Sequence, residues 1–381
     1  MSKKKKIILL GASGSIGLST IKLIRSKKDY FDLIGISVHS NVKFLSEIVK
    51  EFNVKYVAIS NFESSKDFKS KATIFYGRQG LIDLSSINCD LVVSGISGVS
   101  GLLPALNAIR SGSNLAIANK EPLVVAGKIF VSEAKKHNVK ILPVDSEHNS
   151  IFQCFNESQR SNISHITLTA SGGPFLNLGR KDLTNIKPID AIKHPTWRMG
   201  KKISVDSATM VNKALEIIEA GVLFNLTSKE IDVLIHPQSI IHGLVHYKDG
   251  STLANLSNPD MISPLAVALA YPQRLNLNLK NLSLGQISNL TFFEPDLKKF
   301  PALKFGWQAL RSGGAYPVIF NAANEVAVEY FLNNLISFNN IIDLIDNSLS
   351  VINFHSPKNV DDALEIDRIT RLKVIDYIKG L

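Results

Sequence analysis

Short apolar runs alternate with amphipathic segments over the first 144 residues of the chain. Apolar runs of about four to eight residues, bounded by glycines and polar residues, are typical of strands buried on both faces of a sheet. Helical stretches such as Leu102–Ser111 and Ile129–His137 separate the runs. Strands that alternate with helices predict a parallel sheet covered by helices. The expected strands are Lys6–Leu10, Leu33–Val38, Val54–Ile59, Ala72–Tyr76, Leu91–Ser94, Leu115–Ala118 and Val139–Val144.

The pattern changes after about residue 149. His165–Thr169 alternates as a half-exposed strand does, whereas residues 273–300 show little periodicity. After Pro301 helical patterns dominate, and their short connections predict a small antiparallel bundle. Further strands are expected at Val233–Ile235, His242–Tyr247 and Thr252–Leu256, and helices at Ala302–Ser312, Pro317–Leu332, Ile341–Ile352 and Asp361–Ile378.

These patterns predict an α/β chain with several folded parts. Residues 1–144 are expected to form a Rossmann-like domain and residues 145–275 an α+β domain. A connector over residues 276–300 would lead to a C-terminal helical bundle over residues 301–381. A chain of 381 residues is long enough for this division.

Composition narrows the range of partners and compartments. The formal net charge of +10 favours anionic partners. Because the sequence holds no recognisable nucleic-acid module, we expect phosphorylated small molecules rather than nucleic acid. The only cysteines are Cys89 and Cys154, which make no disulfide framework and indicate a reducing cytoplasm. We expect no membrane span, because no run of about 18 apolar residues is present. We expect no signal or transit peptide, because Ile7–Leu10 leads directly into a glycine motif.

A glycine turn links the first expected strand to the first helix. Gly11, Gly14 and Gly17 have the spacing G-x-x-G-x-x-G, and a helical pattern follows from Leu18. A strand, a glycine turn and a helix N-terminus together form a cradle for phosphate, because backbone N–H groups point at the anion. The sequence therefore predicts a dinucleotide site here.

The second expected strand ends at His39-Ser40-Asn41. A site for NAD would require a carboxylate near this point to bind the ribose hydroxyls, and none is present. All three side chains can instead donate hydrogen bonds to a 2′-phosphate. We therefore predict NADPH rather than NADH, with a solvent-exposed turn as the alternative.

Other turns lie where the expected parallel strands end. Gly95–Gly98 and Asn119–Glu121 each follow a strand, and ligands of such sheets bind beyond the carboxyl ends of strands. These two turns are therefore candidates to line the nicotinamide half of the site. Ser171-Gly172-Gly173 offers a hydroxyl and close backbone N–H groups that suit a phosphate, with a plain turn as the alternative.

Asp145-Ser146-Glu147 follows the last strand of the expected parallel sheet. In an extended segment the two carboxylates would point the same way, because side chains alternate with a period of two. They would then repel each other unless a cation lay between them, and oxygen ligands suit Mg²⁺ or Mn²⁺. An Asp-x-Glu pair is also common on protein surfaces. A third carboxylate would favour the metal site, and Glu216 is the natural candidate.

Residues His194–Glu219 form the stretch with the most candidate chemistry. A loop over residues 194–202 is rich in groups that could close over a ligand, and a helix is expected to begin near Asp206 or Ser207. One face of that helix is apolar, and the other carries Asn212, Glu216 and Glu219, with Lys213 three residues before Glu216. An amide, an ammonium and a carboxylate in one turn could hold an oxyanion and a metal together. A solvated amphipathic helix after a mobile loop is the alternative.

Eight strings of residues stand out along the chain. They are, in this order, GASGSIG, LAIANKE, PVDSEHNSIFQ, TASGGPF, HPTWRMGKKISVDSATMVNKALEIIEA, IHPQSIIHG, NPDM and NAANEVAV. Together they resemble the 1-deoxy-D-xylulose 5-phosphate reductoisomerase family. The resemblance runs from Ile7 to the final helix. It implies an enzyme of the non-mevalonate isoprenoid pathway that rearranges and reduces 1-deoxy-D-xylulose 5-phosphate to 2-C-methyl-D-erythritol 4-phosphate. NADPH, a divalent metal (Mg²⁺ or Mn²⁺) and a homodimer are also implied.

The resemblance implies a role for each matching residue. The implied metal ligands are Asp145, Glu147 and Glu216. The implied substrate-binding residues are Lys120, Ser146, Glu147, Ser171, His194, Ser207, Asn212, Lys213 and Glu216, of which Glu147, Lys120 and His194 are also catalytic. The implied NADPH-binding residues are Ser13, Gly14, Ser15, Ile16, His39, Ser40, Asn41, Asn119, Glu121 and Gly200. Trp197 and Met199 would belong to a lid over residues 194–202.

The chain departs from the common pattern of the family in a few places. His39-Ser40-Asn41 stands where many members have Gly-x-Asn, so the 2′-phosphate contacts are the least determined. Arg198 lies inside the lid.

Two rival classes of protein would have the same first domain. One is another two-domain NADP enzyme, such as a semialdehyde or homoserine dehydrogenase, and the other is an inactive NADP-binding regulator. The first would need a cysteine or lysine reaction centre, and the second could lose its carboxylates freely.

Overall fold

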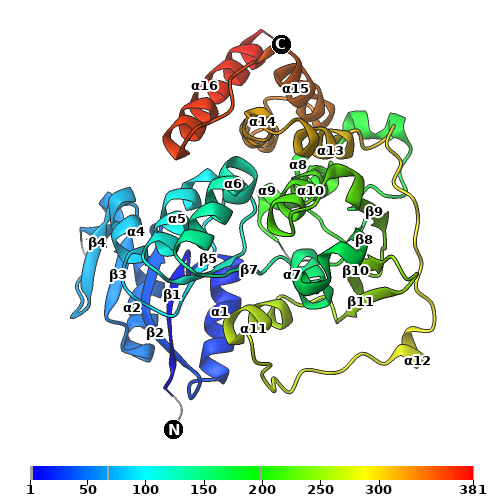
Figure 1. The fold of residues 1–381 in the computed structure, drawn as a ribbon. Helices are drawn as coiled ribbons and strands as arrows, with labels where there is room; N and C mark the ends of the chain where they lie inside the picture. Colours follow the sequence, from blue (N-terminus) through cyan, green and yellow to red (C-terminus); the bar gives the residue numbers. More distant parts are fainter. Residues whose placement is uncertain (1–2, 67, 198, 381) are drawn as a thin grey trace. The chain divides into compact units, whose positions relative to one another are not determined.

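The computed structural model describes residues 3–66, 68–197 and 199–380 (Figure 1). The chain divides into two compact units. The first unit comprises Met1–Pro122, Phe130–Asn149 and Asp260–Asn278, and the second comprises Leu123–Ile129, Ser150–Pro259 and Leu279–Leu381. The domain boundaries expected at residues 144, 275 and 300 stay a prediction.

A parallel sheet of seven strands forms the core of the first unit. Its order is β4-β3-β2-β1-β5-β6-β7, and every pair of neighbours is parallel. The order reverses between β1 and β5, as in Rossmann-like folds. This confirms the expected α/β class. The strands are β1 Lys5–Leu10, β2 Phe31–Val38, β3 Tyr56–Ile59, β4 Thr73–Tyr76, β5 Leu91–Ser94, β6 Asn114–Ile117 and β7 Ile141–Pro143.

Helices cover this sheet on both sides. Helices α4 and α5 pack together against the strands, and α11, from much later in the chain, packs beside α1 (Figure 1). Helix α6 begins at Glu121, so the stretch expected from Ile129 is only its second half. The helices are α1 Ser15–Ser26, α2 Val42–Phe52, α3 Phe62–Ser65, α4 Gly77–Ser85, η1 Val99–Gly101, α5 Leu102–Arg110, α6 Glu121–Lys136 and α11 Ile262–Ala270. Helix α7, Ser146–Cys154, begins in this unit and ends in the second.

The second unit contains a mixed sheet of four strands in the order β11-β10-β8-β9. Strands β8 and β9 are parallel, and β10 is antiparallel to both β8 and β11. Ile166 and Leu168 of β8 point to an apolar core that also contains Ile217 of α10. The strands are β8 Ile163–Ala170, β9 Ile231–Ile235, β10 Ile241–Tyr247 and β11 Thr252–Leu256, as the alternation of the sequence predicted.

Helices form the rest of the second unit. Helix α14 packs against α15 and α16, and α10 packs against α13, which confirms a helical C-terminal region. Residues 279–300 are largely irregular, as expected of a connector. The helices are η2 Glu157–Asn162, η3 Arg180–Asn185, α8 Pro188–Ala191, α9 Lys201–Ala208, α10 Val211–Leu223, η4 Ser228–Glu230, α12 Leu284–Ile287, α13 Ala302–Ser312, α14 Tyr316–Leu332, α15 Phe338–Val351 and α16 Val360–Lys379.

The helix start expected near Asp206 or Ser207 is wrong. Both residues lie inside the short helix α9, which begins at Lys201 in what the sequence suggested was loop. Met210 then adopts a left-handed conformation with φ of 61°, and α10 begins at Val211. A non-glycine residue in that conformation ends a helix. Asn212, Lys213 and Glu216 therefore lie on a helix separate from Ser207.

No helix in the described ranges is both long enough and apolar enough to cross a membrane.

Candidate active site

The glycine turn after β1 leaves no room for side chains at two positions. Gly11 has φ of +80°, and a Cβ there would lie 2.7 Å from the carbonyl oxygen of Gly95. A Cβ at Gly17 would lie 2.3 Å from the carbonyl oxygen of Ala12, so α1 sits directly on the turn. The turn lies where the order of the sheet reverses, which is where doubly wound sheets bind their ligands.

The residues expected to bind the pyrophosphate lie at the N-terminus of α1. Gly14 is the residue before the helix, and Ser15 and Ile16 are its first two residues. The first N–H groups of a helix have no partner within the helix, so they can donate to an anion. Ser13 and Ser15 add hydroxyl groups beside these amides.

The end of β2 carries the predicted 2′-phosphate donors. His39, Ser40 and Asn41 are exposed. Nδ1 of His39 lies 2.8 Å from Oγ of Ser60, and Oδ1 of Asn41 accepts from the backbone N–H of Phe44 and so caps α2. These bonds engage Nδ1 of His39 and Oδ1 of Asn41. The amide nitrogen of Asn41 and the hydroxyl of Ser40 are suited to donate to a ligand.

Polar side chains meet beyond the carboxyl ends of β5, β6 and β7. Oγ of Ser94 donates to Oδ1 of Asn119 over 3.0 Å. Nζ of Lys120 lies 2.6 Å from Oδ2 of Asp145, and both side chains are largely buried. Glu121 is buried at the first position of α6. The structure thus brings together the residues that follow these strands, as the parallel sheet predicted.

The extended geometry expected for Asp145-Ser146-Glu147 is wrong. The backbone N–H of Asn149 donates to the carbonyl oxygen of Asp145, which closes a helical turn, and α7 begins at Ser146. Asp145 therefore precedes a helix and Glu147 lies in its first turn, so the period-two argument does not apply. Oγ of Ser146 donates to Oε2 of Glu147 over 2.6 Å.

The sequence reasoning missed His148. Its side chain is fully buried, and its Nδ1 lies 3.9 Å from Oδ2 of Asp145. The signal was present, because residues three apart on a helical turn are neighbours. The expectation of an extended segment concealed that spacing.

In the second unit, Ser171 and His194 are in contact. Nδ1 of His194 accepts from the backbone N–H groups of Thr196 and Trp197, at 3.1 and 2.9 Å. A ring nitrogen that accepts two hydrogen bonds carries no proton, so the proton is on Nε2. That Nε2–H donates to Oγ of Ser171 over 2.9 Å. The hydroxyl proton of Ser171 is then available to an oxygen of a ligand.

The serine-glycine turn packs against the end of α9. Gly173 has φ of +68°, and a Cβ there would lie 2.8 Å from the carbonyl oxygen of Ser207. The backbone N–H of Gly173 donates to Oγ of Ser171. The close approach places the turn that carries Ser171 next to the helical turn that carries Ser207.

Helix α10 holds a buried carboxylate between two donors. The side chain of Glu216 is 0% exposed, and Lys213 forms an ion pair with its Oε2. Nδ2 of Asn212 donates to its Oε1. A buried carboxylate is stable only when its charge is compensated, and these two neighbours compensate it. Asn212, Lys213 and Glu216, which lie within five residues of α10, thus form one contact set.

The expected lid lies between β8 and α9 along the chain. Trp197 and Met199 are half-buried, and the ring of Trp197 lies 6.2 Å from that of His242 between centroids. Gly200 is exposed and precedes the first residue of α9. Arg198, which the sequence placed inside the lid, lies outside the described residues.

A glycine turn at the reversal point of a parallel sheet is typical of dinucleotide-binding α/β proteins. The carboxylates, lysines and hydroxyls described above suit a phosphorylated, metal-chelating substrate. Three family models match: 1-deoxy-D-xylulose 5-phosphate reductoisomerase over residues 7–127, its C-terminal domain over residues 141–224, and DXP reductoisomerase C-terminal domain over residues 256–373. The chain belongs to the 1-deoxy-D-xylulose 5-phosphate reductoisomerase family.

Relatives of that name match along nearly the whole chain. The protein from Pelodictyon phaeoclathratiforme is 43% identical, over 96% of this chain and 98% of that one. The protein from Clostridium perfringens strain SM101 is 44% identical, with the same coverage of each chain. These comparisons confirm the resemblance that the motifs indicated.

Solved structures of the family share the fold. The Zymomonas mobilis enzyme in complex with NADPH superposes with a TM-score of 0.94, at 37% identity over 100% of both chains. A DOX-P reductoisomerase in complex with NADPH, fosmidomycin and magnesium has a TM-score of 0.93, at 38% identity over 98% of both chains.

Proposed function

We propose that this chain catalyses the NADPH-dependent rearrangement and reduction of 1-deoxy-D-xylulose 5-phosphate to 2-C-methyl-D-erythritol 4-phosphate, in isoprenoid precursor biosynthesis by the non-mevalonate pathway. The observation that carries the proposal lies in the family-specific stretch 194–219, where α9 and α10 follow the expected lid and Glu216 is buried between Asn212 and Lys213. Relatives of the same family were solved with NADPH and magnesium. The rival dehydrogenases have no need of this contact set.

The donor set fits a divalent cation. Asp145, Glu147 and Glu216 offer only carboxylate oxygens, which Mg²⁺ and Mn²⁺ prefer. Two of these carboxylates are already compensated by a lysine, Asp145 by Lys120 and Glu216 by Lys213. We propose that the three carboxylates hold the cation. When bound, the cation would polarise the carbonyl of the ketose and stabilise oxyanion charge.

The remaining polar residues would bind and orient the substrate. Ser171, Ser207, Asn212 and Lys213 offer hydroxyl, amide and ammonium donors for the phosphate and the hydroxyls near it. His194 holds Ser171 through Nε2 and leaves the serine proton for a phosphate oxygen. Phosphate bound away from the reacting carbons can fix the orientation of the ketose.

Proton transfer is assigned to Glu147. Oγ of Ser146 donates to Oε2 of Glu147, and a carboxylate at this position can take or return the proton of a substrate hydroxyl. Nζ of Lys120 can donate to a substrate oxygen beside Asp145. Closure of the lid, with Trp197 as an apolar cover, would exclude water until hydride transfer is complete.

An NADPH-oxidation assay with 1-deoxy-D-xylulose 5-phosphate, with and without divalent metal, tests the proposal. Metal-dependent oxidation with formation of 2-C-methyl-D-erythritol 4-phosphate is expected. Oxidation that needs no metal, or no oxidation with this ketose at saturating cofactor, would contradict it.

NADPH is expected to exceed NADH in kcat/KM by at least about tenfold, the scale of one or two charge-assisted hydrogen bonds. The physical reason is the set of donors at His39, Ser40 and Asn41, with no carboxylate beside them. Steady-state assays with each cofactor check the ratio. Ser40→Ala should lower kcat/KM for NADPH and leave that for NADH unchanged. Equal use of both cofactors by the wild-type chain would refute this assignment.

We also propose a homodimer. The connector exposes large apolar side chains, namely Leu279 (43% exposed), Leu284 (58%), Phe292 (38%) and Phe293 (52%). Several exposed apolar side chains along one segment favour an interface, and a second copy of the chain would cover these.

A charge in the connector is expected to weaken the dimer. Leu284→Asp should shift the mass measured by light scattering after size-exclusion chromatography from two chains toward one, because the carboxylate would be desolvated in the interface. Leu335→Asp is the matched control, since Leu335 is 64% exposed and lies outside the connector. A wild-type chain that elutes as a monomer at every concentration would contradict the dimer.

We further propose a cytoplasmic location. It is supported by the low cysteine content, because two cysteines in 381 residues make no disulfide framework.

A further inference from the structure

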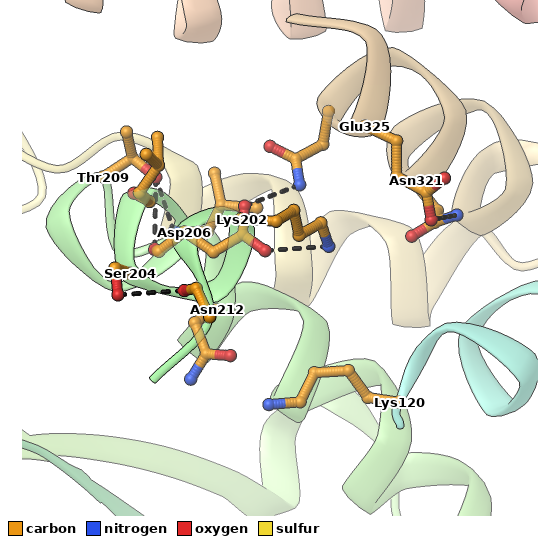
Figure 2. A network of polar contacts seen from close by, with 12 residues as sticks. Lys120, Lys202, Ser204, Asp206, Thr209, Asn212, Asn321 and Glu325 are labelled. Atoms are coloured by element: carbon orange, nitrogen blue, oxygen red, sulfur yellow. Dashed lines mark hydrogen bonds and ion pairs between the residues drawn. The ribbon is translucent and has the colours of Figure 1, made fainter. Parts of the chain in front are cut away.

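Helix α9 is held in the second unit by a buried carboxylate. The side chain of Asp206 is 2% exposed. Its Oδ2 lies 2.8 Å from Nζ of Lys202 on the same helix, and its Oδ1 accepts from Nδ2 of Asn324 over 2.9 Å (Figure 2). Asn324 belongs to α14, so this hydrogen bond joins two elements that are 118 residues apart in the sequence. A hydrogen bond to a buried charge is among the stronger ones in proteins.

Asn324 lies where packing alone would favour an apolar residue. Its side chain is 0% exposed, with Ala323 and Ala327 of the same helix in the surrounding core. Its Oδ1 has no hydrogen-bond partner among the described atoms. An unsatisfied buried carbonyl is costly, so a leucine would pack there at lower cost. The bond to Asp206 is the interaction that requires an asparagine here.

Asn321, one turn earlier in α14, provides a comparison. It is also 0% exposed, but its Nδ2 donates to Oε1 of Glu325 on its own helix (Figure 2). Two equally buried amides thus lie on one helix; Nδ2 of Asn324 donates to α9, whereas Nδ2 of Asn321 donates within α14.

Helix α9 needs such an anchor. An eight-residue helix is not stable in isolation, because nucleation is costly and few hydrogen bonds repay it. Its first turn carries Lys201 and Lys202, the last residues of the expected lid. Its last turn carries Ser207, whose carbonyl oxygen adjoins Gly173. Oγ1 of Thr209 also donates to the carbonyl oxygen of Asp206, which holds the end of the helix.

We propose that Asn324 and Asp206 are positioning residues for substrate binding. Their hydrogen bond fixes α9, and α9 sets Ser207 beside the Ser171-Gly172-Gly173 turn and fixes the C-terminal end of the lid. Neither residue needs to touch the substrate. The inference rests on the proposed function, because it assigns the phosphate of the ketose to Ser171 and Ser207.

Asn324→Leu tests the inference, with Asn321→Leu as the matched control. The first variant removes the bond to α9 and the second removes an equally buried amide that bonds within α14. We expect Asn324→Leu to raise KM for 1-deoxy-D-xylulose 5-phosphate by about tenfold, the scale of one charge-assisted hydrogen bond. KM for NADPH should stay within about twofold of the wild-type value, since Ser13–Ile16 belong to the other unit. Asn321→Leu should change neither constant.

Thermal melting separates positioning from a loss of folding. If Asn324→Leu does not fold, Asn324→Ser takes its place, because its hydroxyl is too short to reach Asp206 and its small side chain does not overpack the core. A folded Asn324 variant whose KM for the ketose equals that of Asn321→Leu would overturn the inference. A wild-type chain that does not turn over the ketose would instead overturn the proposed function, and the inference with it.

Discussion

Glu216→Gln is expected to abolish turnover and to leave NADPH binding nearly intact. The fall in kcat should be at least about 10³-fold, which corresponds to about 4 kcal/mol of lost transition-state stabilisation. The substitution keeps the shape of the side chain, removes its charge and places an NH₂ group where Lys213 or Asn212 now donates. A neutral amide is a poor ligand for Mg²⁺, so the cation would lose one of its three proposed carboxylates.

Two measurements separate this loss from a general disturbance. NADPH binding, followed by fluorescence titration, should be unchanged, because the glycine turn belongs to the other unit. Glu325→Gln is the matched control, since Glu325 is also a largely buried carboxylate in an ion pair, with Arg371. It should retain activity at temperatures below its melting point. Wild-type activity in Glu216→Gln would refute the metal assignment of Glu216.

The parallel sheet and its ligand edge could be predicted because their signals are local. Gly17 is required by a contact with Ala12, which is close in the sequence, and Gly11 by its positive φ. Each strand is an apolar run that needs no partner to be identified. Asn119, Lys120 and Asp145 follow successive strands, so the topology alone placed them at one edge.

Two predictions failed, the helix start near Asp206 and the extended segment at Asp145. Both depended on the backbone conformation that follows a loop or a strand. Asp206 and Ser207 are good N-cap types, yet the break in the helix is at Met210, a residue type with no preference for the left-handed region. At Asp206 the N-cap propensity of the residue is overridden by tertiary contacts, among them the hydrogen bond from Asn324. That partner is 118 residues away and could not be found from local patterns.

The same reasoning explains the error at Asp145. An apolar run with a polar end predicts an extended strand, but β7 stops at Pro143 and the helical turn of α7 starts three residues later. His148 therefore lies beside Asp145, and the buried lysine-carboxylate pair at Lys120 completes the contact set. Charges that compensate each other across elements leave no periodic trace in a sequence.

Chelation is expected to stop the reaction reversibly. In excess EDTA the rate of ketose-dependent NADPH oxidation should fall by at least about 10³-fold, because no protein side chain replaces the charge of a divalent cation beside the ketose. Added Mg²⁺ or Mn²⁺ should restore the full rate. Reversibility follows from the ion pairs of Lys120 with Asp145 and of Lys213 with Glu216, which compensate two carboxylates of the proposed site without metal.

The ion pairs of Lys120 with Asp145 and of Lys213 with Glu216 also predict how the melting temperature should depend on metal. Because the carboxylates are compensated without metal, EDTA should not unfold the chain, and the melting temperature should rise with metal concentration only as far as binding to the native state requires. Glu325→Gln again serves as a control, since its melting temperature should respond to metal as that of the wild type does. Glu216→Gln should lose that response. Full activity in excess EDTA, or unfolding on chelation, would show that the three carboxylates do not have the role proposed for them.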